Sequence, residues 1–319
     1  MTVKSKLSSV YAYLPSRLMN AIACVCQYEL EQISEIRLRR NKKLTLTAYS
    51  KEFYLTENGV LTNSEKIGIG VTDKDIEYIF RLAFKDSIHS FHREIVNGYI
   101  TVNGGCRIGF CGTAVINTSD HSKIENIKDI SSLNIRISRE IIGSADEIYE
   151  KIFAGLSTSL IIIGSPCSGK TTLLRDLTRK LGNNYTVSLI DERNEIAAVY
   201  DGIPQNDIGA KTDVFSSYNK FEGIIAAVKV MSPTYLICDE IGSREDLKAL
   251  EYALNSGVHI VATCHSASYE QARKKPVIKK LVKMQAFENY AVLGNGVNCG
   301  KLVQWGRINT TEQKEKQKC

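Results

Sequence analysis

The chain has 319 residues, of which 43% are hydrophobic and 24% charged, and its formal net charge is +6. This composition is typical of a soluble globular protein, and no apolar run approaches the roughly 20 residues that a membrane-spanning helix needs. The modest positive charge permits anionic partners without requiring them. The N-terminus has no continuous apolar region of the signal-peptide type. The nine cysteines include no CxxC pair, which favours reduced thiols over disulfides or a zinc site. We therefore expect a cytoplasmic protein.

Residues 1–145 are predicted to form a smaller α+β domain. Apolar residues at helical spacing run through Val10–Val25, with a break at Pro15. A second helix is expected after Thr72, whose hydroxyl is placed to cap the free amides of the first turn.

Alternating residues predict the strands of this domain. Residues 34–48 indicate a strand or strand pair around a turn at Asn41. Residues 97–116, NGYITVNGGCRIGFCGTAVI, predict a hairpin turning at Asn103-Gly104. The polar run at residues 119–132 is expected to be a loop.

Residues 146–308 are predicted to form an α/β domain with a mainly parallel sheet, because short apolar strands alternate with helices. The expected strands are residues 160–164, 186–191, 234–240 and 258–264, and the expected helices are residues 171–181, 221–231 and 244–257. The charged tail, residues 309–319, is expected to be disordered.

A phosphate-binding loop is predicted where the first of these strands ends. The sequence Gly164-Ser165-Pro166-Cys167-Ser168-Gly169-Lys170-Thr171, followed by Thr172, matches G-x-x-x-x-G-K-[ST]. Glycines let successive amides turn toward phosphate oxygens, and the following helix points its positive end at the same anion. Lys170 is expected to face solvent and to reach the β- and γ-phosphates of ATP, and the Thr171 hydroxyl is expected to bind Mg²⁺.

Two acidic residues follow the strand at residues 234–240. Asp239 is placed to hold Mg²⁺ through water, and Glu240 to orient and deprotonate an attacking water. A hydrolytic base directly after the magnesium aspartate favours an ATPase over a small-molecule kinase. The alternative is that this acidic pair only ends the strand or caps the next helix.

Other polar strand ends are expected to converge on the same edge of the sheet. Residues 191–193 and 263–266 end neighbouring strands. Glu192 is a second candidate for the water-activating base, and His265 or Thr263 for sensing the γ-phosphate. The alternative for His265 is that it only makes hydrogen bonds to neighbouring residues and has no role in the site.

Several further stretches extend these motifs along nearly the whole chain. Besides the phosphate loop they are EIRLR, GYITVNGGCRIGFCGTAV, LIDERNEIA, QNDIGAKTDV and MSPTYLICDEIGSREDLKAL. Together they resemble the stage III sporulation protein AA family, a branch of the P-loop ATPases related to type II and type IV secretion ATPases. The chain has Cys238-Asp239 where those motors often have a glycine before the glutamate.

The resemblance implies a P-loop fold of the RecA or AAA type and a mother-cell ATPase of endospore formation. Such a protein would lie at the cytoplasmic face of a channel across the membranes around the forespore. Its partners would be membrane-embedded channel proteins and further copies of itself in a hexameric ring. The N-terminal domain would then be a mobile cap over the nucleotide.

Two other functions remain open from the sequence. A nucleic-acid-dependent ATPase would use the basic run at residues 272–283, but that run lacks aromatic residues for base stacking and has the apolar side of an ordinary helix. A nucleotide-gated scaffold would bind ATP with little turnover.

Hydrolysis in this class also uses an arginine supplied by another domain or subunit. Arg136 and Arg139, just before the domain boundary, are favoured over Arg107, Arg193 and Arg244.

Overall fold

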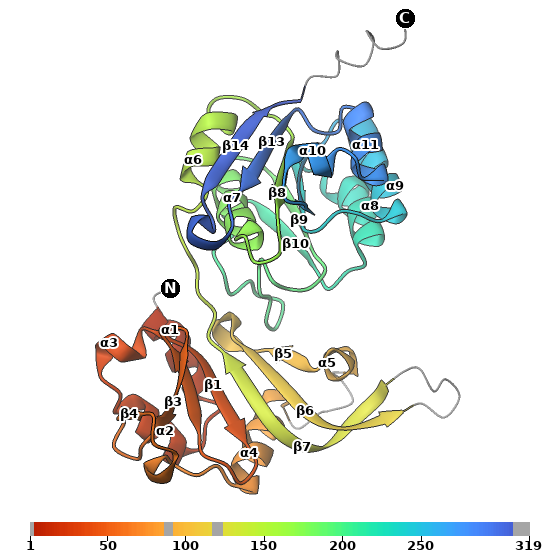
Figure 1. The fold of residues 1–319 in the computed structure, drawn as a ribbon. Coiled ribbons are helices and arrows are strands. Elements are labelled where there is room, and N and C mark those ends of the chain that lie inside the picture. Colours follow the sequence, from red (N-terminus) through yellow and green to blue (C-terminus); the bar gives the residue numbers. More distant parts are fainter. Residues whose placement is uncertain (1–2, 86–91, 117–123, 309–319) are drawn as a thin grey trace, which may run out of the picture. The chain divides into compact units, whose positions relative to one another are not determined.

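The computed structural model describes residues 3–85, 92–116 and 124–308, and the chain divides into two compact units (Figure 1). The first unit contains residues 1–139 together with residues 198–205, and the second contains residues 140–197 and 206–319. The division near residue 139 lies a few residues before the predicted boundary at residue 145. The charged tail, residues 309–319, lies outside the described residues.

The first unit contains a seven-stranded antiparallel sheet in the order β4-β3-β2-β1-β7-β6-β5. Its strands are β1 (Ile33–Arg39), β2 (Thr45–Ala48), β3 (Lys51–Leu55), β4 (Leu61–Thr62), β5 (Tyr99–Thr101), β6 (Arg107–Ile116) and β7 (Ile124–Arg136). The predicted strand pair around Asn41 is confirmed, since β1 and β2 are antiparallel and Asn41 has φ +57°. The hairpin at Asn103-Gly104 is confirmed as the turn between β5 and β6.

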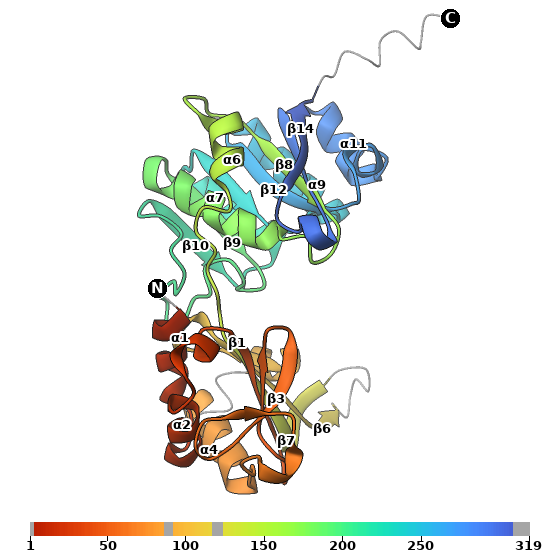
Figure 2. The same ribbon diagram turned by 60° about the vertical axis from the view of Figure 1, so that its left-hand side comes forward.

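Helices cover one face of this sheet, where Figure 2 shows α1, α2 and α4 side by side. The helices of the unit are α1 (Val3–Tyr11), α2 (Ser16–Ala23), α3 (Gln27–Leu30), α4 (Asp73–Ala83) and α5 (His92–Asn97), with 3₁₀ turns at Glu65–Ile67 and Asn103–Gly105. The predicted break is confirmed, because Pro15 precedes the first residue of α2. The predicted cap is also confirmed: Thr72 accepts a hydrogen bond from the Asp75 amide, and the Asp75 side chain accepts one from the Thr72 amide.

The prediction of a loop at residues 119–132 is wrong for the part that the structure describes. Residues 124–132 belong to β7, which pairs with β6 along most of its length. The first half of β7 is largely exposed, so backbone hydrogen bonds rather than burial of one face stabilise it. A polar sequence of this kind lacks the apolar alternation by which strands are predicted.

The second unit contains a seven-stranded sheet in the order β10-β9-β11-β12-β8-β13-β14, in which only β14 is antiparallel to its neighbour. Its strands are β8 (Leu160–Gly164), β9 (Val187–Asp191), β10 (Thr212–Ser216), β11 (Tyr235–Cys238), β12 (His259–His265), β13 (Asn289–Leu293) and β14 (Leu302–Arg307). The four predicted strands, β8, β9, β11 and β12, are confirmed, and β10, β13 and β14 were not predicted.

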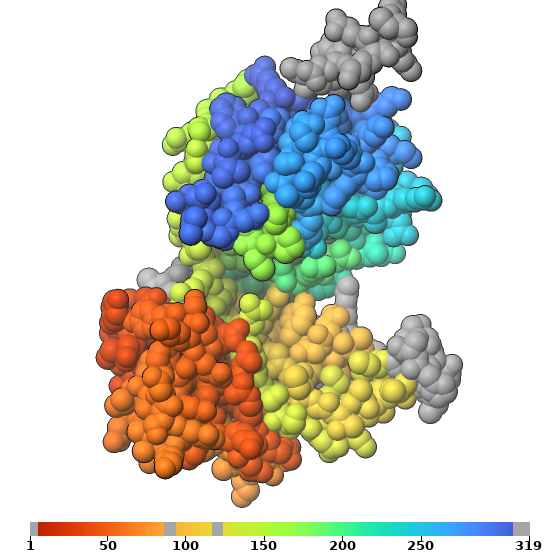
Figure 3. Space-filling model, viewed as in Figure 1, coloured from red at the N-terminus to blue at the C-terminus, as the bar shows by residue number. Residues whose placement is uncertain are grey.

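Helices lie on both faces of this sheet, with α6 and α7 on one face and α8, α9 and α11 on the other (Figures 1 and 2). They are α6 (Asp146–Ile148), continued by a π-helical turn at Tyr149–Phe153, then α7 (Lys170–Asn184), α8 (Lys220–Met231), α9 (Arg244–Asn255), α10 (Tyr269–Ala272) and α11 (Pro276–Lys283), with a 3₁₀ turn at Gly296–Asn298. The segment that contains β13 and β14, coloured blue, forms part of the unit's surface (Figure 3).

Burial explains why these residues form a doubly covered sheet. Every residue of β8, β9 and β11 is buried. In β8, Ile161 and Ile163 belong to the apolar core that α8, α9 and α11 share. The basic run packs as an ordinary amphipathic helix, since Val277, Ile278 and Leu281 of α11 are buried. Because the central strands are parallel, their carboxyl ends meet at one edge of the sheet.

Candidate nucleotide site

The predicted phosphate loop connects the buried strand β8 to α7, as strand and helix patterns predicted. Cys167 and Gly169 have left-handed backbone conformations, with φ +60° and +89°. At Gly164 the loop leaves no room for a side chain, because an added Cβ would lie 2.2 Å from the Ser168 hydroxyl oxygen. The glycines therefore permit a compact loop that ends at the N-terminus of α7, where an anion is favoured.

Lys170 does not face solvent, and this prediction is wrong. The residue is 5% exposed, and its Nζ donates a hydrogen bond of 2.8 Å to the carbonyl oxygen of Ser165 in its own loop. A buried ammonium needs such a partner. Burial lowers the pKa of Lys170 below its ordinary value, although the nearby carboxylates of Asp239 and Glu240 act in the opposite direction.

Thr171 and Asp239 meet at the mouth of the loop. The Thr171 hydroxyl donates a hydrogen bond of 2.9 Å to Asp239 Oδ2. The other carboxylate oxygen of Asp239 accepts hydrogen bonds from the Thr263 hydroxyl and the Glu240 amide. Hydroxyl and carboxylate oxygens are the ligand types that Mg²⁺ prefers, so this pair fits the predicted metal site.

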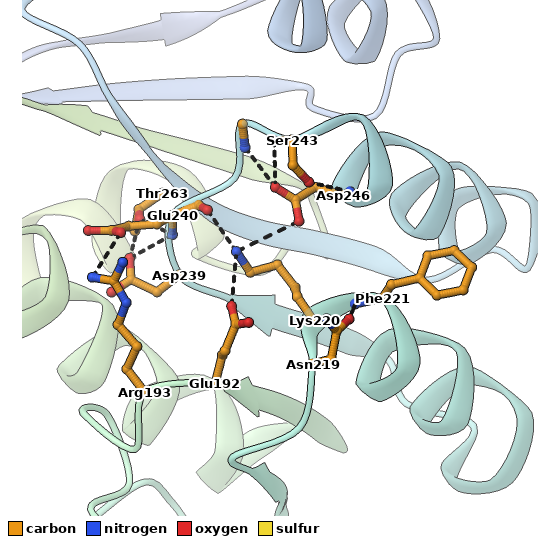
Figure 4. Close-up of polar contacts among 11 residues, drawn as sticks. Glu192, Arg193, Asn219, Lys220, Phe221, Asp239, Glu240, Ser243, Asp246 and Thr263 are labelled. Atoms are coloured by element: carbon orange, nitrogen blue, oxygen red, sulfur yellow. Dashed lines mark hydrogen bonds and ion pairs between the residues drawn. The ribbon is translucent and has the colours of Figure 1, made fainter. Parts of the chain in front are cut away.

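Glu240 is held by groups from two neighbouring strand ends (Figure 4 shows the arginine side). His265 Nε2 lies 2.7 Å from Glu240 Oε1, and Arg193 Nη1 lies 3.1 Å from Glu240 Oε2. Burial tends to raise the pKa of Glu240, but the hydrogen bond to His265 and the charge of Arg193 outweigh it, so the pKa lies below its ordinary value. The predicted convergence of the strand ends is therefore confirmed.

Glu192 lies beside this group but contacts a different cation. Its Oε2 is 3.7 Å from Nζ of Lys220, the first residue of α8. Glu192, Arg193, Asp239, Glu240 and Lys220 line one small cavity of about 70 Å³. A second cavity, of about 480 Å³, is lined in part by Glu192, Glu240 and Lys220.

Sequence reasoning did not single out Lys220. The available signal was a lysine directly after the capping residue Asn219, at the start of a mostly apolar helix.

Of the two favoured arginines, Arg139 is hydrogen-bonded within its own unit, whereas the side chain of Arg136 is mostly exposed. Arg139 Nη2 donates to the main-chain carbonyls of Glu31 and Ile33, at 3.0 and 3.1 Å. The Arg136 side chain is 67% exposed, and its Nε is 3.5 Å from Glu35 Oε1.

Solved structures define the fold class of the second unit and of the chain. The pilus retraction motor PilT with bound ADP has a TM-score of 0.57 at 13% identity, over 89% of this chain and 82% of that one. The ATPase DotB of Yersinia pseudotuberculosis has a TM-score of 0.55 at 14% identity, over 90% of this chain and 78% of that one. The fold is the P-loop fold of the secretion ATPases, which confirms the predicted fold class.

Within that class the family is also clear. The chain matches the model of the family described as "Sporulation stage III, protein AA" over residues 4–309, and it belongs to that family. It is 31% identical over 304 residues to stage III sporulation protein AA of Bacillus subtilis (strain 168), which covers 93% of this chain and 94% of that protein. Among the described residues, no helix is long and apolar enough to cross a membrane.

Proposed function

We propose that this protein binds MgATP at the loop Gly164–Thr172 and hydrolyses it. The observation that carries the proposal is the hydrogen bond of 2.9 Å between Thr171 and Asp239 beside the buried Lys170. It joins the end of the phosphate loop to the acidic residue that follows β11, and this is the arrangement that MgATP requires in P-loop enzymes. The shared fold with ATPases supports the same function.

Each residue of the site has a role in this proposal. Lys170 releases the Ser165 carbonyl and contacts the β- and γ-phosphates, while Thr171 and Asp239 hold Mg²⁺, which supplies charge neutralisation when bound. Glu240 orients the attacking water and accepts its proton, and its low pKa keeps it ionised at neutral pH. Glu192 is the second candidate for this base.

The family and the secretion-type fold support a proposal for the biological role. We propose a motor of endospore formation in the mother cell, acting at the cytoplasmic face of the membranes around the forespore. It would act as a hexamer on membrane-embedded channel proteins and energise their assembly or the transport through them. The buried apolar side of α11 does not favour a nucleic-acid-dependent ATPase.

The test is to measure MgATP affinity and steady-state turnover for the wild type, Lys170→Ala and Glu240→Gln. Lys170→Ala should lose nearly all ATP binding, because no other group of the loop supplies a cation to the phosphates. Glu240→Gln should bind ATP normally and lose at least about 100-fold in kcat, since the amide keeps the shape and loses the base.

Three results would change the proposal. Unchanged ATP affinity in Lys170→Ala would exclude the phosphate loop as the binding site. Loss of turnover in Glu192→Gln but not in Glu240→Gln would move the base to Glu192. Tight ATP binding without turnover in the wild type would favour a nucleotide-gated scaffold instead.

A further inference from the structure

Lys220 stands where local chemistry disfavours a cation. It is the first residue of α8, directly after the capping residue Asn219, and it is 8% exposed. The N-terminal end of a helix carries partial positive charge, which repels an ammonium. Burial adds a desolvation cost for the charged form. Specific contacts must therefore hold the side chain in place.

These contacts come from three separate elements (Figure 4). Lys220 Nζ donates a hydrogen bond of 2.7 Å to the main-chain carbonyl oxygen of Glu240. The same Nζ is 3.7 Å from Glu192 Oε2, after β9, and 3.8 Å from Asp246 Oδ1, in the first turn of α9. One ammonium thus joins the loop after β9, the loop after β11 and the start of α9.

The loop after β11 needs such support, because Glu240 has a left-handed backbone conformation with φ +47°. Non-glycine residues keep this conformation only where the surrounding contacts enforce it. The Glu240 amide donates to Thr263 Oγ1 at 2.8 Å, and Lys220 binds the Glu240 carbonyl. Further along the same loop, the amides of Gly242 and Ser243 both donate hydrogen bonds to Asp246 Oδ2.

We propose that Lys220 is a positioning residue for ATP hydrolysis. By fixing the carbonyl of Glu240, it fixes the direction in which the carboxylate leaves the backbone toward His265 and the attacking water. In this role Lys220 contacts neither ATP nor Mg²⁺ and acts only through Glu240. The proposal rests on the proposed function.

The test compares Lys220→Met with Lys229→Met, a matched change at an exposed lysine in the last turn of the same helix. In Lys220→Met we expect kcat to fall between about 10-fold and 100-fold, which is the effect of a small misplacement of a reacting group. The dissociation constant of MgATP should stay within about twofold of the wild-type value, because the phosphate loop is untouched. Lys229→Met should match the wild type, and Lys220→Arg, which restores a cationic donor, should recover part of kcat.

A double variant separates positioning from simple stability. If Lys220 acts through Glu240, then Lys220→Met should lower the residual turnover of Glu240→Gln by less than about twofold. The reason is that substitutions of residues that act as a unit do not have additive effects on kcat. A full additional loss in the double variant would overturn the proposal. So would wild-type kcat in Lys220→Met, or a parallel loss of MgATP affinity.

The remaining outcomes are also decisive. If Lys220→Met does not fold, Lys220→Gln, which keeps a polar group, is measured in the same way. Unfolding of both variants would make Lys220 a stability residue and overturn the proposal. Absence of turnover in the wild type would overturn the proposed function and this inference together, whereas wild-type turnover in Lys220→Met alone would overturn only the inference.

Discussion

Glu240 has two partners that keep its carboxylate ionised, and they differ in exposure. The Arg193 side chain is 65% exposed and the His265 side chain 40% exposed, while that of Glu240 is 32% exposed. Solvent and salt therefore screen the arginine pair substantially. The Arg193–Glu240 ion pair therefore serves mainly to lower the pKa of Glu240, and its contribution to folding stability is small.

A pH profile tests this assignment. Glu240 has a lowered pKa in the folded protein, so it is ionised above that pKa and activity should be lost as the pH falls through it. Arg193→Ala removes one cause of the lowering, so the acid limb of the kcat/KM profile should move to higher pH. The profiles are compared after each is normalised to its own maximum.

Salt provides the control for this experiment. High salt screens the exposed Arg193 charge in the wild type, so it should reduce the difference between the two acid limbs. Coincident acid limbs at low salt would contradict the assignment of Arg193 as a partner that lowers the pKa of Glu240.

The sequence predicted which acidic and basic residues belong to the site better than it predicted where their side chains point. Asp239 and Glu240 were predictable because they directly follow a buried strand, where parallel strands place polar groups at one edge. The direction of Lys170 depends on a carbonyl of the folded loop, which no sequence pattern encodes. Lys220 was missed because its partners come from three distant stretches of the chain.

Among the elements, the predictable strands are those buried on both faces. β8, β9 and β11 read as continuous apolar runs with clear ends. The edge strands β10 and β14 are half-exposed with no regular alternation, so their sequences carry no comparable signal. Their place in the sheet depends on backbone hydrogen bonds to the neighbouring strands β9 and β13.

The segment after β9 is organised by one buried carboxylate. Asp191 is 3% exposed, and it accepts hydrogen bonds of 2.8, 3.0 and 2.8 Å from the amides of Glu195, Ile196 and Ala197. Arg175 of α7 donates to the carbonyls of Glu195 and Ile196. The polar strand end thus has two uses: Asp191 folds the following turn, and Arg193 faces the candidate site.

Asp191→Asn should therefore destabilise the protein by about 2–4 kcal/mol, because an amide cannot replace a carboxylate that accepts three hydrogen bonds. Urea denaturation measures the change in free energy of unfolding. Asp213→Asn is the matched control, since Asp213 is exposed on β10, and it should change stability by less than about 0.5 kcal/mol. A comparably small effect in Asp191→Asn would show that this turn contributes little to the fold.

At the scale of the whole molecule, the chain passes between its two units at three places. It does so near residue 139 and again on either side of residues 198–205, which belong to the first unit. In that unit Lys85 forms an ion pair of 2.6 Å with Asp201, and the Gly104 amide donates to Gln205 at 2.9 Å. The segment that Asp191 organises leads directly into residues 198–205, so the candidate site and the first unit are linked by a short covalent connection.

For the proposed hexameric ATPase, a further question is which arginine would complete the site. An arginine that contacts the transferred phosphate is worth about 10³–10⁵ in rate in related enzymes. Arg193 already lies in the second unit, but its guanidinium is paired with Glu240. Arg139 is held by main-chain carbonyls of Glu31 and Ile33. The exposed Arg136 is therefore our preferred candidate for reaching the site of a neighbouring subunit.

Mixing inactive subunits tests this contact. Arg136→Ala and Glu240→Gln should each be inactive alone, but sites that combine Glu240 of one subunit with Arg136 of another should recover in a mixed ring. Random assembly of equal amounts should restore about a quarter of the wild-type sites, because each such site needs one particular pair of neighbours.

Arg139→Ala mixed with Glu240→Gln is the control, and its main expected effect is lower stability of the first unit. Full activity of Arg136→Ala alone would remove this arginine from the mechanism. Failure of the mixture to recover, with both variants forming normal rings, would exclude Arg136 as a contact between subunits.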